Sequence, residues 1–357
     1  TMFLGILIFA LSLFGAFIVR SGIIDSVHSF ANDPQRGLYL LIFSGLITLL
    51  ALGVFAYRIP SLNASKFVVS GSKESFLSMN NILMVTSIFS IFLGVTYPLI
   101  IEAINGEKVS IGPPYYNTIF TPLILITAIF IMASVDSLWQ RSKPLKSYVY
   151  KTFFPVILSI LFTYFVWHIT ETFSILSYIG IFSGLLILFT YLLRVLNNFF
   201  YKKFINKGSA IAHIGLGLLF LAVSLNSILS YEKNLNLAPG ESIFVNESIK
   251  EFSFDNIKVL KASNHDVISV AVSLLQDAKN IIRHPQKRKY ATRGQITTES
   301  SIYASILKDT YLTIGDQLEN GSWTFALKIN YFIKWIWFSA SLMVMGMLIT
   351  IFKKKAT

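Results

Sequence analysis

The sequence predicts a polytopic α-helical membrane protein of about eight transmembrane helices, with a small external antiparallel β domain between the last two. Three observations support this fold class. Hydrophobic residues make up 54% of the 357 residues and charged residues only 13%, whereas soluble proteins carry about 25% charged residues. Apolar runs of the length that crosses a bilayer recur along the chain. The stretch 231–331, which precedes the last run, is instead rich in charged residues.

Each apolar run is identified as a span by its length, since a helix of roughly 20 residues spans the hydrocarbon core. The eight predicted spans are residues 2–19, 38–57, 81–103, 119–139, 153–168, 174–194, 209–230 and 332–352. The fifth is the weakest, because it is short, carries Pro155 near its start and ends on Trp167 and His168.

The basic residues predict the orientation of these spans. A net charge of +12 first suggests nucleic acid, but a chain this hydrophobic is a membrane protein, and we expect no nucleic-acid partner. Alternate connections and the C-terminal tail hold fourteen Lys and Arg residues, against three in the other short connections. The positive-inside rule places the fourteen in the cytoplasm or its equivalent. Residues 231–331 then lie on the periplasmic or outer side.

Period-two alternation predicts strands in this external stretch. It appears at 242–245, 257–260, 267–272 and 323–327, with turn signals at Gly240, Asn264 and Asn320-Gly321. The chain is thus predicted to divide into three parts. These are a seven-span bundle at 1–230 with an external histidine loop at 20–37, an external β domain at 231–331, and a last span with a basic cytoplasmic tail at 332–357.

Several classes of chemistry are excluded or disfavoured. The chain has no Cys, which excludes disulfides, thiolate ligands and thioether-linked cofactors on this chain. It contains no Gly-rich phosphate loop, no HExxH and no G-x-S-x-G motif. The spans carry almost no acidic residues, which counts against an ion-coupled transporter with a carboxylate relay at the membrane midplane.

The five histidines are the candidate ligands. His213 lies just inside the predicted seventh span, where Ala212, Gly215 and Gly217 offer a small-residue surface to a flat group or to another helix. Neutral imidazole is a natural axial ligand for haem iron in a membrane, and a hydrogen bond to a neighbouring helix is the competing interpretation.

His28 lies in the predicted external loop, three residues after Asp25, so both share a face if the loop is helical. Arg20 at the membrane boundary could pair with a propionate. From the residues alone, a polar turn with an exposed His28 is the favoured interpretation. The roles of His168, which an aromatic belt explains, and of the basic cluster 283–293 stay open, and His265 and His284 are interpreted as solvated loop residues.

Several sequence segments together resemble the CcmF family of haem lyase subunits in cytochrome c maturation. Gly15–Gly22 followed by Ser26–Ala31 is similar to the family signature GTFxxRSGxxxSVHAFA. Weaker matches follow in the family's order at Ile111–Asn117, Ala212–Gly215, Pro285–Tyr290 with Thr297–Glu299, and Lys334–Trp337.

The resemblance implies an enzyme that attaches haem covalently to the CxxCH cysteines of apocytochrome c on the outer side of the membrane. It implies that His28 ligates the incoming haem, a haem b substrate, and that His213 ligates a transmembrane b-type haem that serves as the reductant path. The implied partners are apocytochrome c, a haem chaperone and other lyase-complex subunits. The implied location is a bacterial inner membrane or, as second choice, a mitochondrial one.

The sequence departs from the family pattern in two places. The Trp-rich external segment and the first histidine of each pair belong upstream of the first matching segment, and the proline expected before the last span is absent. We therefore expect either a fragment or the C-terminal half of a split protein that works with a separate N-terminal half. The rival hypothesis is a non-enzymatic transporter or assembly scaffold whose external β domain binds partners.

Overall fold

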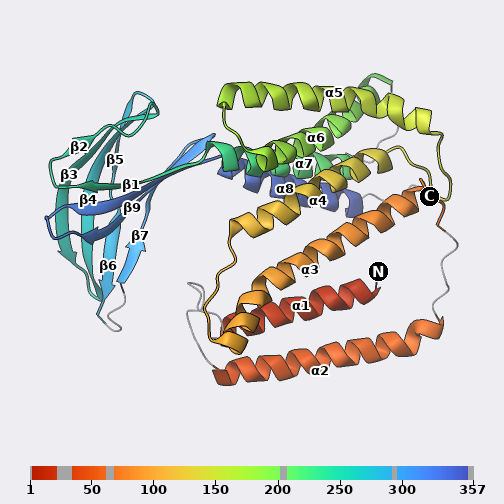
Figure 1. Cartoon of the computed structure of the whole chain (residues 1–357), viewed down its shortest axis with the longest axis horizontal. Coiled ribbons are helices and arrows are strands. Elements are labelled where there is room, and N and C mark those ends of the chain that lie inside the picture. The colour runs from red at the N-terminus through yellow and green to blue at the C-terminus, as the bar shows by residue number, and fades with distance from the viewer. Residues whose placement is uncertain (1, 22–33, 62–67, 202–206, 292–295, 353–357) are drawn as a thin grey trace. The chain divides into compact units, whose positions relative to one another are not determined.

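The computed structural model describes residues 2–21, 34–61, 68–201, 207–291 and 296–352. Within these ranges, eight helices are long and apolar enough to cross a membrane. Ten β-strands lie between the last two helices along the chain (Figure 1). The predicted fold class, a polytopic helical protein with a β domain inserted before the last span, is confirmed.

Each helix matches one of the predicted spans, with different ends. The helices are α1 (Met2–Ser21), α2 (Pro34–Arg58), α3 (Lys73–Asn105), α4 (Pro113–Ser134), α5 (Leu145–Thr170), α6 (Ile175–Tyr201), α7 (Lys207–Leu229) and α8 (Ile333–Phe352), and a 3-10 turn, η1 (Ile59–Ser61), follows α2. Helix α3 starts earlier than predicted, because the Ser72 hydroxyl caps it by accepting a 3.3 Å hydrogen bond from the Ser75 amide. Helix α4 also starts early, on Pro113, which suits the first helical position.

One structural unit comprises Thr1–Ile119 and Ser137–Ser142. In it, the rings of Phe14 on α1 and Phe92 on α3 lie 6.1 Å apart. The Tyr115 hydroxyl donates a 3.0 Å hydrogen bond to the Ser90 carbonyl. This approach depends on Gly94 in the next turn of α3, because a Cβ there would lie 2.8 Å from the Tyr115 ring.

The second unit comprises Phe120–Asp136 and Lys143–Thr357, and in it α7 packs between α6 and α8 (Figure 1). Glycines make both contacts close. A Cβ on Gly184 would lie 2.8 Å from the Gly217 carbonyl, and one on Gly346 would lie 2.5 Å from the Gly208 carbonyl. Membrane helices associate mainly through such close packing, because lipid tails provide no hydrophobic drive between helices.

The β domain is a sandwich of two antiparallel sheets. Its strands are β1 (Tyr231–Leu237), β2 (Ser242–Ile243), β3 (Ile249–Lys261), β4 (His265–Gln276), β5 (Lys279–Arg283), β6 (Gln286–Tyr290), β7 (Ile296–Glu299), β8 (Ser301–Ala304), β9 (Lys308–Gln317) and β10 (Trp323–Tyr331). One sheet has the order β1-β10-β9-β8, and the other has β2-β3-β4-β6-β7 with β5 paired to β4. All four segments predicted as strands contribute to strands, although β2 ends at Ile243.

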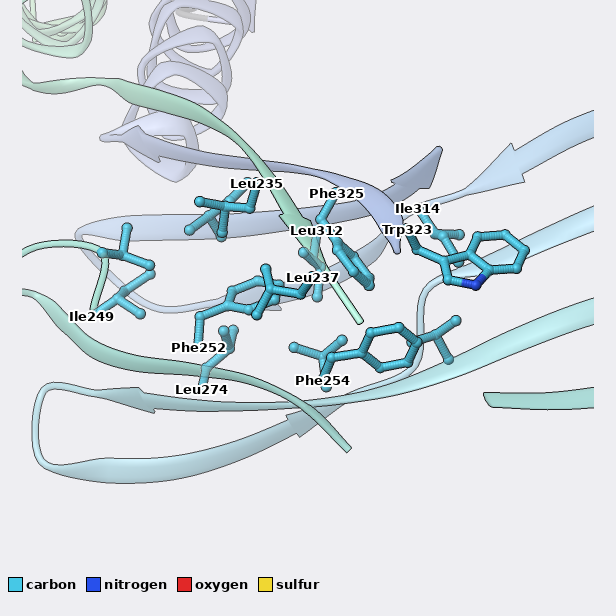
Figure 2. Packing of buried hydrophobic residues seen from close by; sticks show 14 of the residues in the cluster. Leu235, Leu237, Ile249, Phe252, Phe254, Leu274, Leu312, Ile314, Trp323 and Phe325 are labelled. Carbon is cyan, nitrogen blue, oxygen red and sulfur yellow. The ribbon is translucent and has the colours of Figure 1, made fainter. Parts of the chain in front are cut away.

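Alternating residues of both sheets fill the space between them, as Figure 2 shows. Phe325 on β10 meets Phe252 and Phe254 on β3 edge to face, with centroids 5.5 and 5.2 Å apart, a favoured aromatic geometry. One buried polar pair interrupts this core, where the Thr310 hydroxyl donates a 3.0 Å hydrogen bond to the Gln276 side-chain oxygen. Alternation of this kind is the pattern from which the strands were predicted.

Hydrogen bonds join the sandwich to the helices that flank it. The Asn226 side-chain oxygen on α7 accepts from the Ser230 hydroxyl at 2.8 Å and from the Tyr331 amide at 2.9 Å. The next amide, of Phe332, donates to the Leu307 carbonyl at 2.7 Å, and Phe332 has a φ of 60°. Proline lacks an amide proton and is fixed near φ −65°. The absence of proline at these two positions therefore has a structural reason.

Candidate functional site

His213 lies in the second turn of α7, and the backbone fixes the tautomer of its ring. The Nδ1 atom is 2.7 Å from the carbonyl oxygen of Ser209, one turn earlier. A carbonyl only accepts, so Nδ1 carries a proton, and in the neutral ring Nε2 then keeps its lone pair. Ligating histidines are oriented in the same way, by a hydrogen bond from the other ring nitrogen. The geometry therefore fits a neutral imidazole that offers Nε2 to a metal.

Tyr191 on α6 fixes the plane of the same ring. The two rings are stacked, with centroids 4.6 Å apart and planes inclined by 14°. Tyr191 is buried in a cluster with Ala128, Leu186, Ile187 and Ala210, so its ring is held from several sides. Sequence reasoning missed Tyr191, because no local pattern links it to a residue on the next helix.

The sequence left open whether the small residues around His213 face a flat group or another helix, and their contacts in the structure answer this. Gly215 faces α8, where a Cβ would lie 2.8 Å from the Ser339 carbonyl, and Gly217 faces α6 near Gly184. Ala212 lies against Gly346 of α8. The small-residue surface of α7 is therefore taken up by neighbouring helices rather than by a flat group.

An ion cluster holds the end of α6 that carries Tyr191. Arg194, one turn after Tyr191, pairs with the Asp136 carboxylate, and the Lys151 ammonium lies 3.3 Å from the same carboxylate. Burial by itself raises the pKa of Asp136, but the hydrogen bonds and charges of Arg194 and Lys151 outweigh it, so this pKa lies below its ordinary value. The cluster links α5 and α6 to the segment after α4.

Three further residues were considered for the site, namely Arg20, His28 and His168. Arg20 is exposed in the last turn of α1, and His28 lies outside the described residues. His168 is exposed at the end of α5, with its ring 6.4 Å from that of Tyr164. Across the described ranges, no group of three or more His, Asp or Glu residues is placed to hold a metal ion.

The two remaining histidines lie in the β domain. His284 is exposed between β5 and β6, as the sequence indicated. His265 is not in a loop but opens β4, with its Nδ1 atom 2.6 Å from the Asn264 side-chain oxygen. The basic cluster is also partly paired, since Arg288 lies 3.6 Å from Glu299 and Lys287 contacts Asp316.

Known proteins resemble this chain along nearly its whole length. The model of the CcmF C-terminal β-sandwich matches residues 228–331. The cytochrome c-type biogenesis protein CcmF of Pseudomonas aeruginosa is 30% identical over 97% of this chain and 54% of its own length. CcmF of Escherichia coli is 29% identical over 99% of this chain and 55% of its own length.

A solved structure shares the fold. The structure described as cytochrome c heme lyase CcmF has a TM-score of 0.72 and 15% identity, and the match covers 96% of this chain and 53% of that one. The chain spans about half the length of the curated relatives that it matches. In sequence this chain is similar to the C-terminal portion of the CcmF proteins, its β domain matches their C-terminal β-sandwich, and its fold is that of the solved structure.

Proposed function

We propose that this chain is the C-terminal half of a cytochrome c haem lyase, an integral protein of a bacterial inner membrane whose β-sandwich lies on the periplasmic side. Its activity is the attachment of haem to the CxxCH cysteines of apocytochrome c. It acts with an N-terminal half, a haem chaperone and other lyase-complex subunits. The observation that carries the proposal is His213, because its Nδ1–H bond to Ser209 and its stack on Tyr191 leave Nε2 as a ligand atom.

His213 would supply one ligand of a transmembrane b-type haem, and the N-terminal half would supply the other. A bound haem of this kind would carry single electrons toward the outer side of the membrane. Ser209 and Tyr191 hold the imidazole in a fixed orientation and plane, and the α6–α7–α8 packing holds the helix that bears it. We expect no stable haem binding by this chain alone, since it carries one ligand of the pair.

His28 ligates the haem that is the substrate, on the outer side, and Arg20 contacts a propionate of that haem. Each substrate thiol adds across a vinyl group. The S–H bond and the vinyl π bond break, and one C–S and one C–H bond form, without net oxidation or reduction. Such an addition needs the vinyl groups and thiols to be held in register rather than an acid or a base on the protein. The role of the chain in this step is therefore positioning.

The two histidines can be tested separately in the chain co-expressed with its N-terminal half. His213→Ala should abolish the b-type Soret absorbance of the purified complex. His28→Ala should abolish cytochrome c assembly and leave that absorbance in place. His168→Ala and His284→Ala, which change exposed histidines, serve as matched controls and should alter neither.

Two results would contradict the proposal. Wild-type spectra and normal cytochrome c assembly in both variants would remove the two ligand assignments. A complex without any haem signal in its reduced-minus-oxidised spectrum would favour the scaffold or transporter instead.

A further inference from the structure

The turn between β8 and β9 presents two large apolar side chains to its surroundings. Ile306 is 72% exposed and Leu307 is 53% exposed. Turns at the surface of soluble domains are usually built from polar residues and glycine. The backbone of this turn is well fixed, because the Ser305 hydroxyl donates to the Lys308 carbonyl at 2.7 Å and accepts from the Lys308 amide at 3.2 Å. The apolar tip is therefore held in place.

The same turn is hydrogen-bonded to the beginning of the last span. The Leu307 carbonyl accepts from the Phe332 amide at 2.7 Å, and the Ile306 carbonyl accepts from the Trp335 indole nitrogen at 3.2 Å. Helix α8 begins at Ile333. The turn thus lies level with the first turn of a transmembrane helix.

That level coincides with the boundary of the bilayer. Helix α8 has 20 residues, and at about 1.5 Å per residue such a helix just spans a hydrocarbon core of about 30 Å. Tryptophan concentrates at membrane–water interfaces, and Trp335 and Trp337 both lie in the first turns of α8, where Trp337 is 73% exposed. The start of α8 therefore has the composition of an interfacial segment.

The charge beside the turn is directed away from it. Lys308 follows the two apolar residues, but its ammonium lies 2.7 Å from the Asp277 carboxylate and 2.6 Å from the Ser248 hydroxyl. Its side chain is only 14% exposed. The tip of the turn consequently shows apolar surface and no free charge, which suits insertion at the edge of the hydrocarbon region.

We propose that the β8–β9 turn inserts Ile306 and Leu307 into the lipid interface of the leaflet in which α8 begins. The bilayer then supports the sandwich at a third point, in addition to the connections from α7 and into α8. This inference needs only that α8 spans the membrane, so it does not depend on haem binding or on the lyase activity proposed above.

The absence of Cys from the chain makes a direct test possible. Ile306→Cys and, separately, Leu307→Cys are labelled with an environment-sensitive fluorophore in the full chain in lipid nanodiscs. Glu319→Cys is the matched control, because Glu319 is exposed in the turn at the other end of β9. A strand of this length separates the two turns by about 33 Å.

Lipids with a spin label at the headgroup should quench the fluorophore at 306 and at 307 but not at 319, and aqueous iodide should quench it strongly only at 319. Iodide quenching at 306 and 307 equal to that at 319 would show a turn in water and overturn the proposal. Protection of 306 and 307 from both quenchers would show a protein surface over the turn and would overturn it as well.

Discussion

The imidazole ring of His213 lies nearly parallel to the phenol ring of Tyr191, with the centroids 4.6 Å apart. The Ser209 carbonyl holds the Nδ1 edge of the same imidazole. One contact comes from within α7 and the other from α6, so the ring is fixed in rotation and in plane by two different helices. If His213 is the ligand that we propose, this arrangement would favour binding, because an imidazole that is already ordered loses less conformational freedom when it binds iron.

Tyr191 is therefore predicted to position His213. In the complex with the N-terminal half, Tyr191→Leu should shift the electron paramagnetic resonance g values of the b-type haem, because the imidazole plane is released. Tyr191→Phe keeps the ring, and with it a stacking energy of about 0.5–1.5 kcal/mol, and should leave the g values unchanged. If Tyr191→Leu and the wild type give identical spectra while the haem signal still depends on His213, the positioning role of Tyr191 is wrong. The assignment of His213 as a ligand would then stand.

Asn226 is predicted to fix the sandwich to α7. Asn226→Ala leaves the Tyr331 amide and the Ser230 hydroxyl without their acceptor, which should cost about 1–3 kcal/mol. Asn226→Asp retains an acceptor oxygen and is the control. Thermal unfolding in detergent gives the loss of stability, and limited proteolysis between β10 and α8 reports on the connection. Equal melting temperatures for Ala and wild type would contradict this role.

Asp136 predicts a pH dependence. Its pKa is lowered in the folded protein by Arg194 and Lys151. The stabilisation of the folded protein by the Asp136 ion pairs is therefore complete above the pKa of this carboxyl in the unfolded chain, about 3.9. It is lost as the pH falls through the lower pKa of the folded protein. Asp136→Asn should destabilise the protein at neutral pH by about 1–2 kcal/mol, and this difference should shrink near pH 3. A difference in melting temperature that stays constant from neutral to acidic pH would argue against the ion cluster.

Gly346 is predicted to be essential for the α7–α8 contact. A Cβ at this position would lie 2.5 Å from the Gly208 carbonyl, so Gly346→Ala should force the helices apart and cost about 1–3 kcal/mol. Gly53→Ala on α2 is the same substitution at a position with nothing within 4 Å, and it should be neutral or slightly stabilising. Melting temperatures of both variants in detergent compare them directly, and equal effects would contradict the packing argument.

The spans and strands were predictable because burial leaves a local trace in the sequence. A bilayer demands a run of apolar residues, so the eight helices were recognised from hydropathy. A sandwich demands alternation, as on β4 and β10. The ends were less predictable, because Ser72 and Pro113 shift helix starts through capping and backbone geometry rather than through hydrophobicity.

The candidate site could be predicted only in part. His213 stood out because a polar residue inside a span is costly. Ser209 lies four residues before His213, and this helical spacing could have indicated that the two residues contact each other. The interpretation of Gly215 and Gly217 stayed open, since close packing against a helix and against a cofactor demand the same small residues. The structure resolved it through the contacts of α7 with α6 and α8.

The sequence alone determined the class of the protein and its number of spans, and it indicated His213 as a candidate ligand. Each follows from the chemistry of single residues or of short segments in a given solvent. Only the tertiary structure decided that Tyr191 stacks on His213, that Arg194 pairs with Asp136, and that Trp335 reaches the carbonyl of Ile306. These pairs join helices and turns that are distant along the chain, so they depend on how the elements pack, which no local pattern encodes.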